Sequence, residues 1–509
     1  MLAKSYSFGL SGLDGLLVEI EVDITRGLPC AIIVGLPDNA VKESKERVRA
    51  AIKNSGFNYP ADRITVSLAP ADIKKEGPLF DLPIALGILA ATKQIDKEKL
   101  RNFIILGELA LDGNIRPVKG SLPIALSIAK SGFNCLLLPK ENALEAAIVK
   151  KISVYPVKTL VEVVNFLSDP DSTKPIKVDA EDILKGCRDY DVDFSEVKGQ
   201  IHVKRALEVA AAGGHNVLLI GPPGSGKTML AKRIPTIIPD MNLDEALETT
   251  KIHSISGLVP SGSGLIAARP FRTSHHTSSD IALVGGGPMP KPGEISLAHN
   301  GILFLDELPE FHRDVLEALR QPLEDGFITV SRATKTLKFP SKFMLICAMN
   351  PCPCGYFTDP KKQCRCTPTK IHRYLSKVSG PLLDRIDIYI EVPSLQYKEL
   401  TSEAQTESSK TIKSRVDKTR SVQRKRYSNK IFSNAQMNHA QIKKYCTIDE
   451  EAKQLLKMAV NELGFSARAY DKILKISRTI ADLAGENQIL SEHVSEAIQY
   501  RSLDRNLWF

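Results

Sequence analysis

The sequence lacks any long apolar stretch. Across its 509 residues, no uninterrupted apolar run approaches the roughly 20 residues that a membrane-spanning helix needs. The N-terminus also lacks the basic flank followed by an apolar segment that is typical of a secretory signal. These absences argue against membrane and secreted proteins. We therefore expect a soluble, cytoplasmic protein.

Cysteine is scarce, with nine residues in the whole chain. This number is too small for a disulfide scaffold at this length, which favours a reducing compartment. Four of the nine crowd between Cys352 and Cys366, and this clustering suggests a metal site. The other five are expected to be inert core thiols.

Positive charge is only slightly in excess of negative charge. The net charge of +9 does not prove a polyanionic partner, although it favours nucleic acid over an acidic ligand surface. Residues 410–430 hold nine basic residues against one acid, Asp417, in a stretch of helical composition. This segment is either a solvated helix or a helix that contacts phosphates.

The length allows about three domains. Residues 1–168 alternate strand-like and helical runs, which predicts a self-contained α/β domain. Residues 169–198 hold two prolines and many charges, as expected of a linker. Residues 199–393 repeat strand, glycine-rich loop and helix, which predicts a doubly wound parallel sheet with helices on both faces. Residues 394–509 have no strand-like run, and amphipathic helices dominate there.

A phosphate-binding motif follows the apolar run at 217–220, and a helical segment follows the motif. Glycines in such a loop let backbone N–H groups turn toward a phosphate, lysine adds a point charge, and threonine offers a hydroxyl to Mg²⁺. This order of strand, loop and helix predicts a nucleotide site. The loop, which we call the phosphate loop, consists of Gly221, Pro222, Pro223, Gly224, Ser225, Gly226, Lys227 and Thr228.

Two further apolar strands end in polar residues. The run at 301–305 ends in Asp306 and Glu307, where a Mg²⁺-orienting acid and a water-activating base are needed. The run at 343–349 ends at Asn350, whose amide fits a role in fixing the attacking water or the γ-phosphate. A turn residue is the plainer interpretation of Asn350. Asn350 follows the third apolar strand that ends in polar residues, and this position favours the functional interpretation.

These motifs together resemble the AAA+ ATPases, in the magnesium-chelatase-like branch and its YifB/ComM family. The resemblance covers nearly the whole chain and rests on residues 221–228, 303–310, 348–350, 382–387 and 466–469. It implies that Asn350 is sensor 1, that Arg468 is sensor 2, and that Arg385 is the arginine finger of a neighbouring subunit's site. A finger that acts in trans requires a ring, usually a hexamer in this class. The alternative role for Arg385 is an ordinary surface salt bridge.

Two insertions are candidates for DNA contact. The polar loop at 269–293 carries Arg269, Arg272 and Lys291, and the resemblance implies a helix-2 insert with a hairpin that projects toward the pore of a ring. The adjacent His275 and His276 are not expected to share a metal, because neighbours on an extended chain point in opposite directions.

The second insertion, at 326–338, consists of two strand-like runs about a short turn, which predicts a basic hairpin. It carries Arg332, Lys335 and Lys338. Cations around a pore would give salt-dependent binding without base readout. A solvent-exposed hairpin without a ligand is the alternative.

The crowded cysteines form two C-x-C pairs separated by nine residues: Cys352, Cys354, Cys364 and Cys366. Four thiolates suit a tetrahedral structural Zn²⁺ site, and the pairs are tighter than the common C-x-x-C knuckle. Reduced loop cysteines or a redox pair are the alternatives. The position just after Asn350 suggests that the site stiffens a loop beside the sensor.

The first domain resembles the Lon-type protease domain, a ribosomal-S5-like α/β fold, through residues 66–71, 75–78 and 106–118. In that family a nucleophilic serine follows shortly after Gly-Pro, but at this position the chain has residues 79–83, which include Asp81 and no serine. The activating lysine is also missing from its expected position, where the chain has residues 119–123. Lys119 and Ser121 leave a shifted dyad as a minor alternative. Without a nucleophile and its base, no acyl-enzyme forms, and the domain is expected to lack protease activity.

Three functions from different classes remain: a DNA translocase, a chelatase-like motor that acts on a protein partner, and an ATP-dependent protease. The lost dyad argues against the last. The resemblance implies a hexameric helicase that uses ATP and Mg²⁺, binds single-stranded, duplex or branched DNA, and migrates branches during natural transformation. A recombinase is a further candidate partner. The chelatase-like motor is the alternative.

Overall fold

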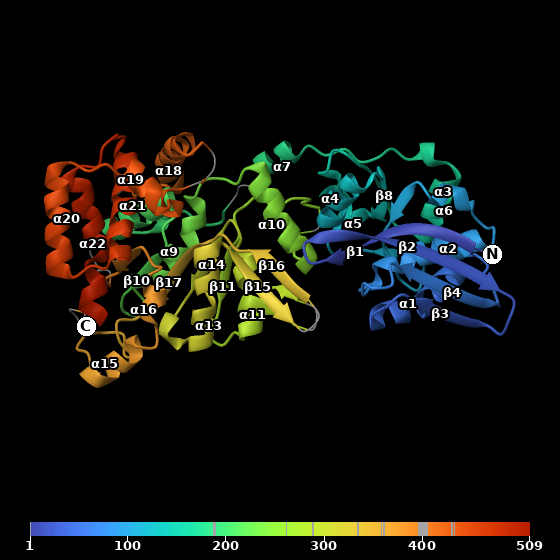
Figure 1. The fold of residues 1–509 in the computed structure, drawn as a ribbon, viewed down its shortest axis with the longest axis horizontal. Coiled ribbons are helices and arrows are strands. Elements are labelled where there is room, and N and C mark those ends of the chain that lie inside the picture. The colour runs from blue at the N-terminus through green and yellow to red at the C-terminus, as the bar shows by residue number, and fades with distance from the viewer. Residues whose placement is uncertain are drawn as a thin grey trace. The chain divides into compact units, whose positions relative to one another are not determined.

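The computed structural model describes residues 2–186, 190–260, 262–287, 290–332, 335–357, 359, 362–394, 406–428, 431 and 433–508. Its elements are drawn in Figure 1. The chain divides into two compact units, the first made of residues 1–188 and 242–267 and the second of residues 189–241 and 268–509. Each unit has its own hydrophobic core. Among the described residues, no helix has the length and apolarity needed to cross a membrane.

The first unit is built on a seven-stranded mixed sheet of order β3-β4-β2-β1-β5-β8-β9. Its strands are β1 (Leu2–Ser11), β2 (Asp14–Thr25), β3 (Cys30–Val34), β4 (Arg63–Ala69), β5 (Phe103–Ile105), β8 (Cys135–Pro139) and β9 (Ser153–Val157), with β6 (Glu108–Leu109) and β7 (Ile115–Arg116) as a separate pair. In β2, Val18, Ile20 and Val22 alternate into the core, as expected of a strand with one buried face.

The first unit also contains helices, several of which pack on this sheet. They are α1 (Asn39–Asn54), α2 (Asp81–Ala91), α3 (Lys97–Leu100), α4 (Ser121–Ser131), α5 (Lys140–Ala147), α6 (Leu160–Ser168) and α7 (Ala180–Gly186), with short 3₁₀ turns η1 (Pro78–Phe80) and η2 (Pro170–Ser172). Every residue of α2 is buried, so this helix has no polar face. The α/β character predicted for residues 1–168 is confirmed.

One helix of the first unit comes from a distant part of the sequence. Helix α10 (Leu243–Ser256) lies between the phosphate loop and strand β11 in the chain, yet it packs on α4. Its Leu247 contacts the core of the first unit, and the Ser254 carbonyl accepts a hydrogen bond of 3.1 Å from the Gly120 N–H. The domain boundaries predicted from the sequence place this helix in the ATPase core at residues 199–393, whereas the structure places it in the first unit.

The second unit contains a five-stranded parallel sheet of order β11-β14-β17-β10-β18. Its strands are β10 (Val217–Ile220), β11 (Phe271–Ser274), β14 (Ile302–Leu305), β17 (Met344–Met349) and β18 (Ile388–Glu391). Strands β10, β14 and β17 are buried throughout, which explains their continuous apolar sequences. Because the strands are parallel, Gly221, Asp306 and Asn350 follow carboxyl ends at one edge of the sheet.

Helices and short turns connect these strands. They are η3 (Phe194–Glu196), α8 (Ile201–Gly213), α9 (Lys227–Arg233), η4 (Ile234–Thr236), α11 (Asp280–Val284), α12 (Glu294–Leu297), η5 (Leu308–Glu310), α13 (Arg313–Ala318), α14 (Arg320–Asp325), α15 (Pro368–Leu375) and α16 (Gly380–Leu383). The predicted insertions form two antiparallel pairs, β12 (Gly285–Gly286) with β13 (Lys291–Pro292) and β15 (Phe327–Arg332) with β16 (Lys335–Pro340). The hairpin predicted at 326–338 is confirmed.

The C-terminal region is helical. Its elements are α18 (Ser409–Arg426), η6 (Asn434–Gln436), α19 (His439–Tyr445), α20 (Glu450–Leu463), α21 (Ala467–Ala484) and α22 (Ser491–Trp508). Helix α21 packs on α8 and α22 packs on β18, so these helices share the core of the second unit. Within the described part of residues 394–509 no strand occurs, as predicted.

The basic helix α18 uses several of its cations inside the protein. Arg415 contacts Glu208 and Glu407, Lys413 lies 2.6 Å from Asp240, and Arg426 pairs with Asp482. These ion pairs give Lys413, Arg415 and Arg426 a structural role within the protein. Lys410, Lys418 and Lys425 are exposed, which is compatible with both a solvated helix and a helix that contacts phosphates.

The cysteines outside the cluster differ in burial. Cys347 and Cys446 are buried, and burial raises the pKa of both thiols, that of Cys446 to about 12. Cys30 is exposed on the edge strand β3, and Cys135 is half-buried. The expectation of core thiols is therefore wrong for Cys30, because its position in β3 faces away from the core. Cys187 lies outside the described residues.

Candidate nucleotide site

The phosphate loop adopts the geometry that its glycines require. Gly224 and Gly226 have φ of +78° and +90°, a region that glycine enters without steric cost. A Cβ on Gly221 would lie 2.2 Å from the Val392 carbonyl oxygen, so only glycine fits against this segment. Strand β10 precedes the loop and helix α9 follows it. The predicted order of strand, loop and helix is confirmed.

Lys227 lies at the centre of the site. Its side chain is nearly buried, and its ammonium donates to the carbonyls of Gly221 (2.7 Å) and Pro222 (2.9 Å) and to Asn350 Oδ1 (3.1 Å). Burial lowers the pKa of Lys227 to about 8, against the opposing effect of Asp306 and Glu307. The structure therefore brings together two residues that stand 123 positions apart in the sequence.

Replacing Lys227 with alanine is expected to raise the Kd for ATP about a hundredfold, because a charged hydrogen-bond donor to the phosphates is removed. Titration with a fluorescent ATP analogue measures this change. The matched control is Lys232→Ala, since Lys232 is an exposed lysine on the same helix. An unchanged Kd in Lys227→Ala would place the nucleotide elsewhere.

The lowered pKa of Lys227 predicts a pH dependence of nucleotide binding. Only the protonated amine attracts the triphosphate, and the bound triphosphate holds that proton. The free protein loses the proton as the pH rises through about 8. The Kd for ATP should therefore rise about tenfold between about pH 7 and about pH 9. A Kd that stays constant over this interval would show that Lys227 remains charged in the free protein.

The acidic pair at the end of β14 adjoins the phosphate loop. The Thr228 hydroxyl donates to Asp306 Oδ2 at 2.7 Å, and the Glu307 N–H donates to Asp306 Oδ1 at 2.9 Å. These oxygen donors fit Mg²⁺, which prefers carboxylate and hydroxyl ligands. Glu307 is exposed and has φ of +54°, an unfavourable value for a residue with a side chain. This strained turn lets the Glu307 side chain project beside the site.

A histidine that sequence reasoning set aside contacts the predicted base. His276 Nδ1 lies 3.1 Å from Glu307 Oε2. The rings of His275 and His276 lie 4.1 Å apart between centroids, so they do not point in opposite directions as an extended chain would require. The reason is that His276 begins a turn after β11. The pairing with Glu307 could not be inferred from spacing.

The two predicted arginines make different contacts. Arg385 pairs with Glu324 and donates to the Pro381 carbonyl, and its side chain is 14% exposed. Arg468, at the start of α21, lies 3.6 Å from Asp384 and is 65% exposed. Both recorded ion pairs therefore involve carboxylates of the same chain rather than residues of the phosphate loop.

The backbone around Arg385 is held by a buried polar network that sequence reasoning missed. Asn216 donates through Nδ2 to the Arg385 carbonyl, and its N–H donates to Asp387 Oδ2. Lys472 of α21 lies 2.9 Å from Asp387 Oδ1. Burial alone would raise the pKa of Asp387, but Lys472 and His215 outweigh it and hold the pKa below its ordinary value. A charged Asp387 thus ties the Arg385 segment to the C-terminal helices.

The candidate DNA residues fall into two groups. Arg269 donates to the carbonyls of Pro239, Asn300 and Asp240, and Arg272 makes a bidentate pair with Glu294 at 2.6 and 2.7 Å. These guanidinium groups serve the local fold.

The second group lies on the two small hairpins. Lys291 is exposed on β13, and exposed Lys338 lies 4.9 Å from the ring centroid of Phe327. Arg332 and Lys335 pair at the end of the longer hairpin, and their side chains lie outside the described residues. The lysines are therefore the described side chains best placed for an external ligand.

The four predicted cysteine ligands converge. The ligand atoms of Cys352, Cys354, Cys364 and Cys366 all lie within 4.8 Å of one another. Among the described residues, this group is the one that meets the geometry of a metal site. The donors are all thiols, which suits Zn²⁺.

The residues compared with a Lon-type dyad in the sequence are Asp81, Lys119 and Ser121. Buried Asp81 accepts from Arg47 Nε at 2.7 Å and from the Leu109 N–H at 3.3 Å. Burial raises the pKa of Asp81 to about 6, against the effect of Arg47. Ser121 is fully buried while Lys119 is exposed. This arrangement offers no accessible serine for a shifted dyad.

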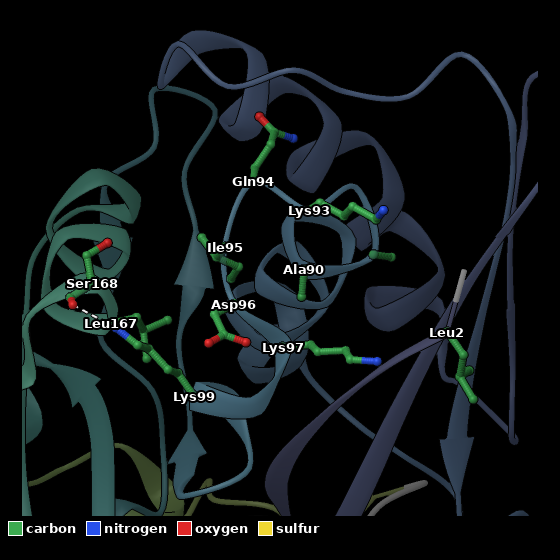
Figure 2. A pocket seen from close by; sticks show the side chains of 11 residues that line it. Leu2, Ala90, Lys93, Gln94, Ile95, Asp96, Lys97, Lys99, Leu167 and Ser168 are labelled. Atoms are coloured by element: carbon green, nitrogen blue, oxygen red, sulfur yellow. Dashed lines mark hydrogen bonds between the residues drawn. The ribbon is translucent and has the colours of Figure 1, made fainter.

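A cavity of about 650 Å³ lies in the first unit. Figure 2 shows that its lining comes from the end of α2, the loop that follows, α3, and the ends of α6 and β1, and Lys99 donates to the Ser168 carbonyl at 2.7 Å. The lining combines lysines with aliphatic side chains. It contains none of the predicted site residues.

Comparison with known proteins places these features in a family. Residues 193–400 match the family described as magnesium chelatase, subunit ChlI, residues 20–142 match subunit ChlI of Mg-chelatase, and residues 406–501 match the ChlI C-terminal family. The chain is 47% identical to competence protein ComM of Haemophilus influenzae, over 99% of this chain and 98% of that protein. It is 43% identical to the protein YifB of Salmonella typhimurium, over 99% of this chain and 98% of that one.

A more distant similarity links part of the chain to a protease family. Lon protease 2 of Bacillus subtilis is 27% identical over 33% of this chain and 33% of its own length. The matches over nearly the full length decide the assignment, and they agree with the phosphate loop, the acidic pair and the parallel sheet. This chain belongs to the magnesium-chelatase-like AAA+ ATPases, in the YifB/ComM family.

Proposed function

We propose that this protein is an ATP-driven DNA translocase that acts as a hexameric ring and promotes branch migration of recombination intermediates. The observation that carries the proposal is the assembled nucleotide site, in which Lys227 contacts Asn350 and Thr228 contacts Asp306. The 47% identity to a relative named competence protein directs the proposal toward natural transformation. A cytoplasmic location fits this role.

In this proposal each site residue has one task. Thr228 and Asp306 hold Mg²⁺, which would neutralise charge on the phosphates. Glu307 accepts a proton from water, Asn350 orients the γ-phosphate through its contact with Lys227, and Arg468 senses the nucleotide. Arg385 supplies a guanidinium to the site of the adjacent subunit, where its fixed fork of donors suits a transferring phosphoryl group.

The domain roles follow from the same assignment. Residues 1–168 act as a Lon-like domain without its dyad, 169–198 as a linker, 199–393 as the ATPase core and 394–509 as a helical lid. Helix α7 and the turn η3 lie within the linker range. The four cysteines hold a structural Zn²⁺ in the core.

DNA contact is assigned first to the lysines of the two hairpins. Exposed Lys291 and Lys338 are available, and Arg332 and Lys335 belong to the same hairpin as Lys338. Six copies around a ring would track a phosphate backbone without reading bases. Arg269 and Arg272 would support these hairpins through their internal contacts rather than bind phosphates first.

The proposal is tested with a synthetic four-way junction whose arms share homology. Purified protein should convert the junction into two duplex arms with ATP but not with a non-hydrolysable analogue. Glu307→Gln protein should bind the junction and leave it intact. Rapid ATP hydrolysis with no conversion of any branched substrate would reject branch migration.

A chelatase-like motor that acts on a protein partner is the second candidate. The matches of residues 193–400 and 406–501 to magnesium chelatase families favour it. This candidate requires ATP hydrolysis that is indifferent to DNA. The same junction assay, run beside an ATPase assay, separates the two candidates.

A further inference from the structure

The four cysteine sulfurs are arranged as a metal would hold them. Cys352 Sγ lies 3.3 Å from Cys354 Sγ and 3.7 Å from Cys364 Sγ, and Cys354 Sγ lies 3.6 Å from Cys364 Sγ. Sulfurs placed about 2.3 Å from a tetrahedral Zn²⁺ would be about 3.8 Å apart, whereas a disulfide needs about 2.05 Å. The observed spacing fits a zinc tetrathiolate.

Backbone groups complete the surroundings of these sulfurs. The Cys366 N–H donates to Cys364 Sγ at 3.4 Å, and the Gly355 N–H donates to the Cys352 carbonyl at 2.9 Å. Hydrogen bonds of this kind orient ligands in metal sites. The segment between residues 352 and 366, here called the four-cysteine loop, therefore offers both ligands and their supports.

The four-cysteine loop packs directly on the phosphate loop. A Cβ on Gly355 would lie 2.4 Å from Pro223 Cδ and 2.8 Å from Pro223 Cγ, and Gly355 has φ of +84°. Both the close approach and the backbone conformation thus require glycine. Pro223 belongs to the turn that encircles a bound phosphate, so movement of Gly355 changes the support of that turn.

The same loop is joined to the site at a second point. Cys352 is fully buried and follows Asn350 by two residues, and Asn350 accepts the hydrogen bond from Lys227. A loop anchored at Cys352 therefore fixes the position of the Asn350 amide. Two contacts, one through Pro223 and one through Asn350, connect the cysteine cluster to the phosphate-binding atoms.

We infer that Zn²⁺ bound by the four cysteines braces the phosphate loop, so that zinc occupancy sets the affinity of the site for nucleotide. The inference rests on the proposed ATPase site and adds Zn²⁺ as a regulator of its affinity for nucleotide. Four zinc–sulfur bonds would fix the positions of the four cysteines, so that metal binding rather than nucleotide binding supplies the free energy that orders them. Loss of the metal should therefore appear as weaker nucleotide binding.

The first experiment measures zinc and nucleotide affinity in the full-length protein, without DNA and without turnover. Elemental analysis should find about one Zn²⁺ per chain. Cys354→Ser and Cys364→Ser should lose the metal and raise the Kd for a fluorescent ATP analogue about tenfold, within the range of coupled sites. Cys30→Ser, at an exposed cysteine outside the cluster, should change neither value.

The second experiment keeps the metal and breaks the contact. Gly355→Ala should retain zinc and still raise the Kd for nucleotide, because the new methyl group meets Pro223. Gly56→Ala is the matched control, since Gly56 has φ of +82° with no atom within 4 Å of its added Cβ. If a cysteine variant fails to fold, removal of zinc from wild-type protein by a chelator provides the same comparison.

The outcomes distinguish failure of this inference from failure of the proposed function. Wild-type protein without zinc, or a wild-type Kd in both the zinc-depleted protein and Gly355→Ala, overturns the inference and leaves the ATPase proposal standing. Wild-type protein that holds zinc but binds no nucleotide overturns the proposed function instead. Loss of affinity in both the zinc-depleted protein and Gly355→Ala, with no loss in Cys30→Ser or Gly56→Ala, supports the inference.

Discussion

Glu307→Gln protein is expected to bind ATP with near wild-type affinity and to hydrolyse it about a thousandfold more slowly. Glutamine keeps the size and the hydrogen-bonding capacity of the side chain but cannot accept a proton from water. Asp306 and Thr228, which are proposed to hold Mg²⁺, are untouched by this change, and their 2.7 Å contact should persist. Steady-state hydrolysis and equilibrium binding of a fluorescent ATP analogue measure the two properties separately.

The control for Glu307 is its neighbour Glu310. Glu310 is an exposed carboxylate in the following 3₁₀ turn, 3.0 Å from Lys377. Glu310→Gln should hydrolyse ATP at nearly the wild-type rate. Retained turnover in Glu307→Gln would assign the base to another residue. Loss of nucleotide binding in that variant would show instead that Glu307 supports the site structurally.

Arg385→Ala protein is expected to bind ATP and to hydrolyse it about a thousandfold more slowly, the effect of losing an arginine finger. Arg385 pairs with Glu324 of its own chain in this structure. The prediction therefore requires that the guanidinium leave Glu324 for the adjacent subunit's phosphates. Measurement of ATP affinity and turnover in Arg385→Ala and in Glu324→Gln tests this exchange, since Glu324→Gln should bind ATP and keep its turnover.

Mixed assemblies test the action in trans. When Arg385→Ala and Lys227→Ala chains are co-assembled at equal amounts, about a quarter of the interfaces should join an intact phosphate loop to an intact finger. ATP hydrolysis should recover to a corresponding share of the wild-type rate. Co-assembly of Lys227→Ala with Glu307→Gln should show no recovery, because those residues belong to one site. No recovery in the first mixture would assign Arg385 to its own subunit.

The candidate nucleotide site was predictable because each of its parts directly follows a recognisable buried strand. The phosphate loop is contiguous, and its glycines leave few alternatives for the backbone. Asp306 and Asn350 each follow a buried strand, and parallel strands bring their carboxyl ends to one edge. In the structure Lys227 contacts Asn350 and Thr228 contacts Asp306. The convergence of the four cysteines was also predictable, since their spacing is short.

Contacts between distant segments were not predictable. His276 reaches Glu307 only because the chain turns after β11, and periodicity does not report such a turn. Asp387, Lys472 and Asn216 meet through three separate elements. Helix α10 joins the first unit through tertiary packing, although its sequence position lies within the second. A composition-based interpretation counts the positive charge of Arg269 and Arg272 but does not show that both are used internally.

Whether the protein is a DNA motor is decided by steady-state ATP hydrolysis of the purified protein without DNA and with single-stranded, duplex and four-way-junction DNA, at two salt concentrations. We expect strong stimulation by DNA that falls at the higher salt, because the proposed contacts are made to phosphates. A hydrolysis rate that is the same with and without every DNA would contradict a DNA motor and favour a motor that acts on a protein partner.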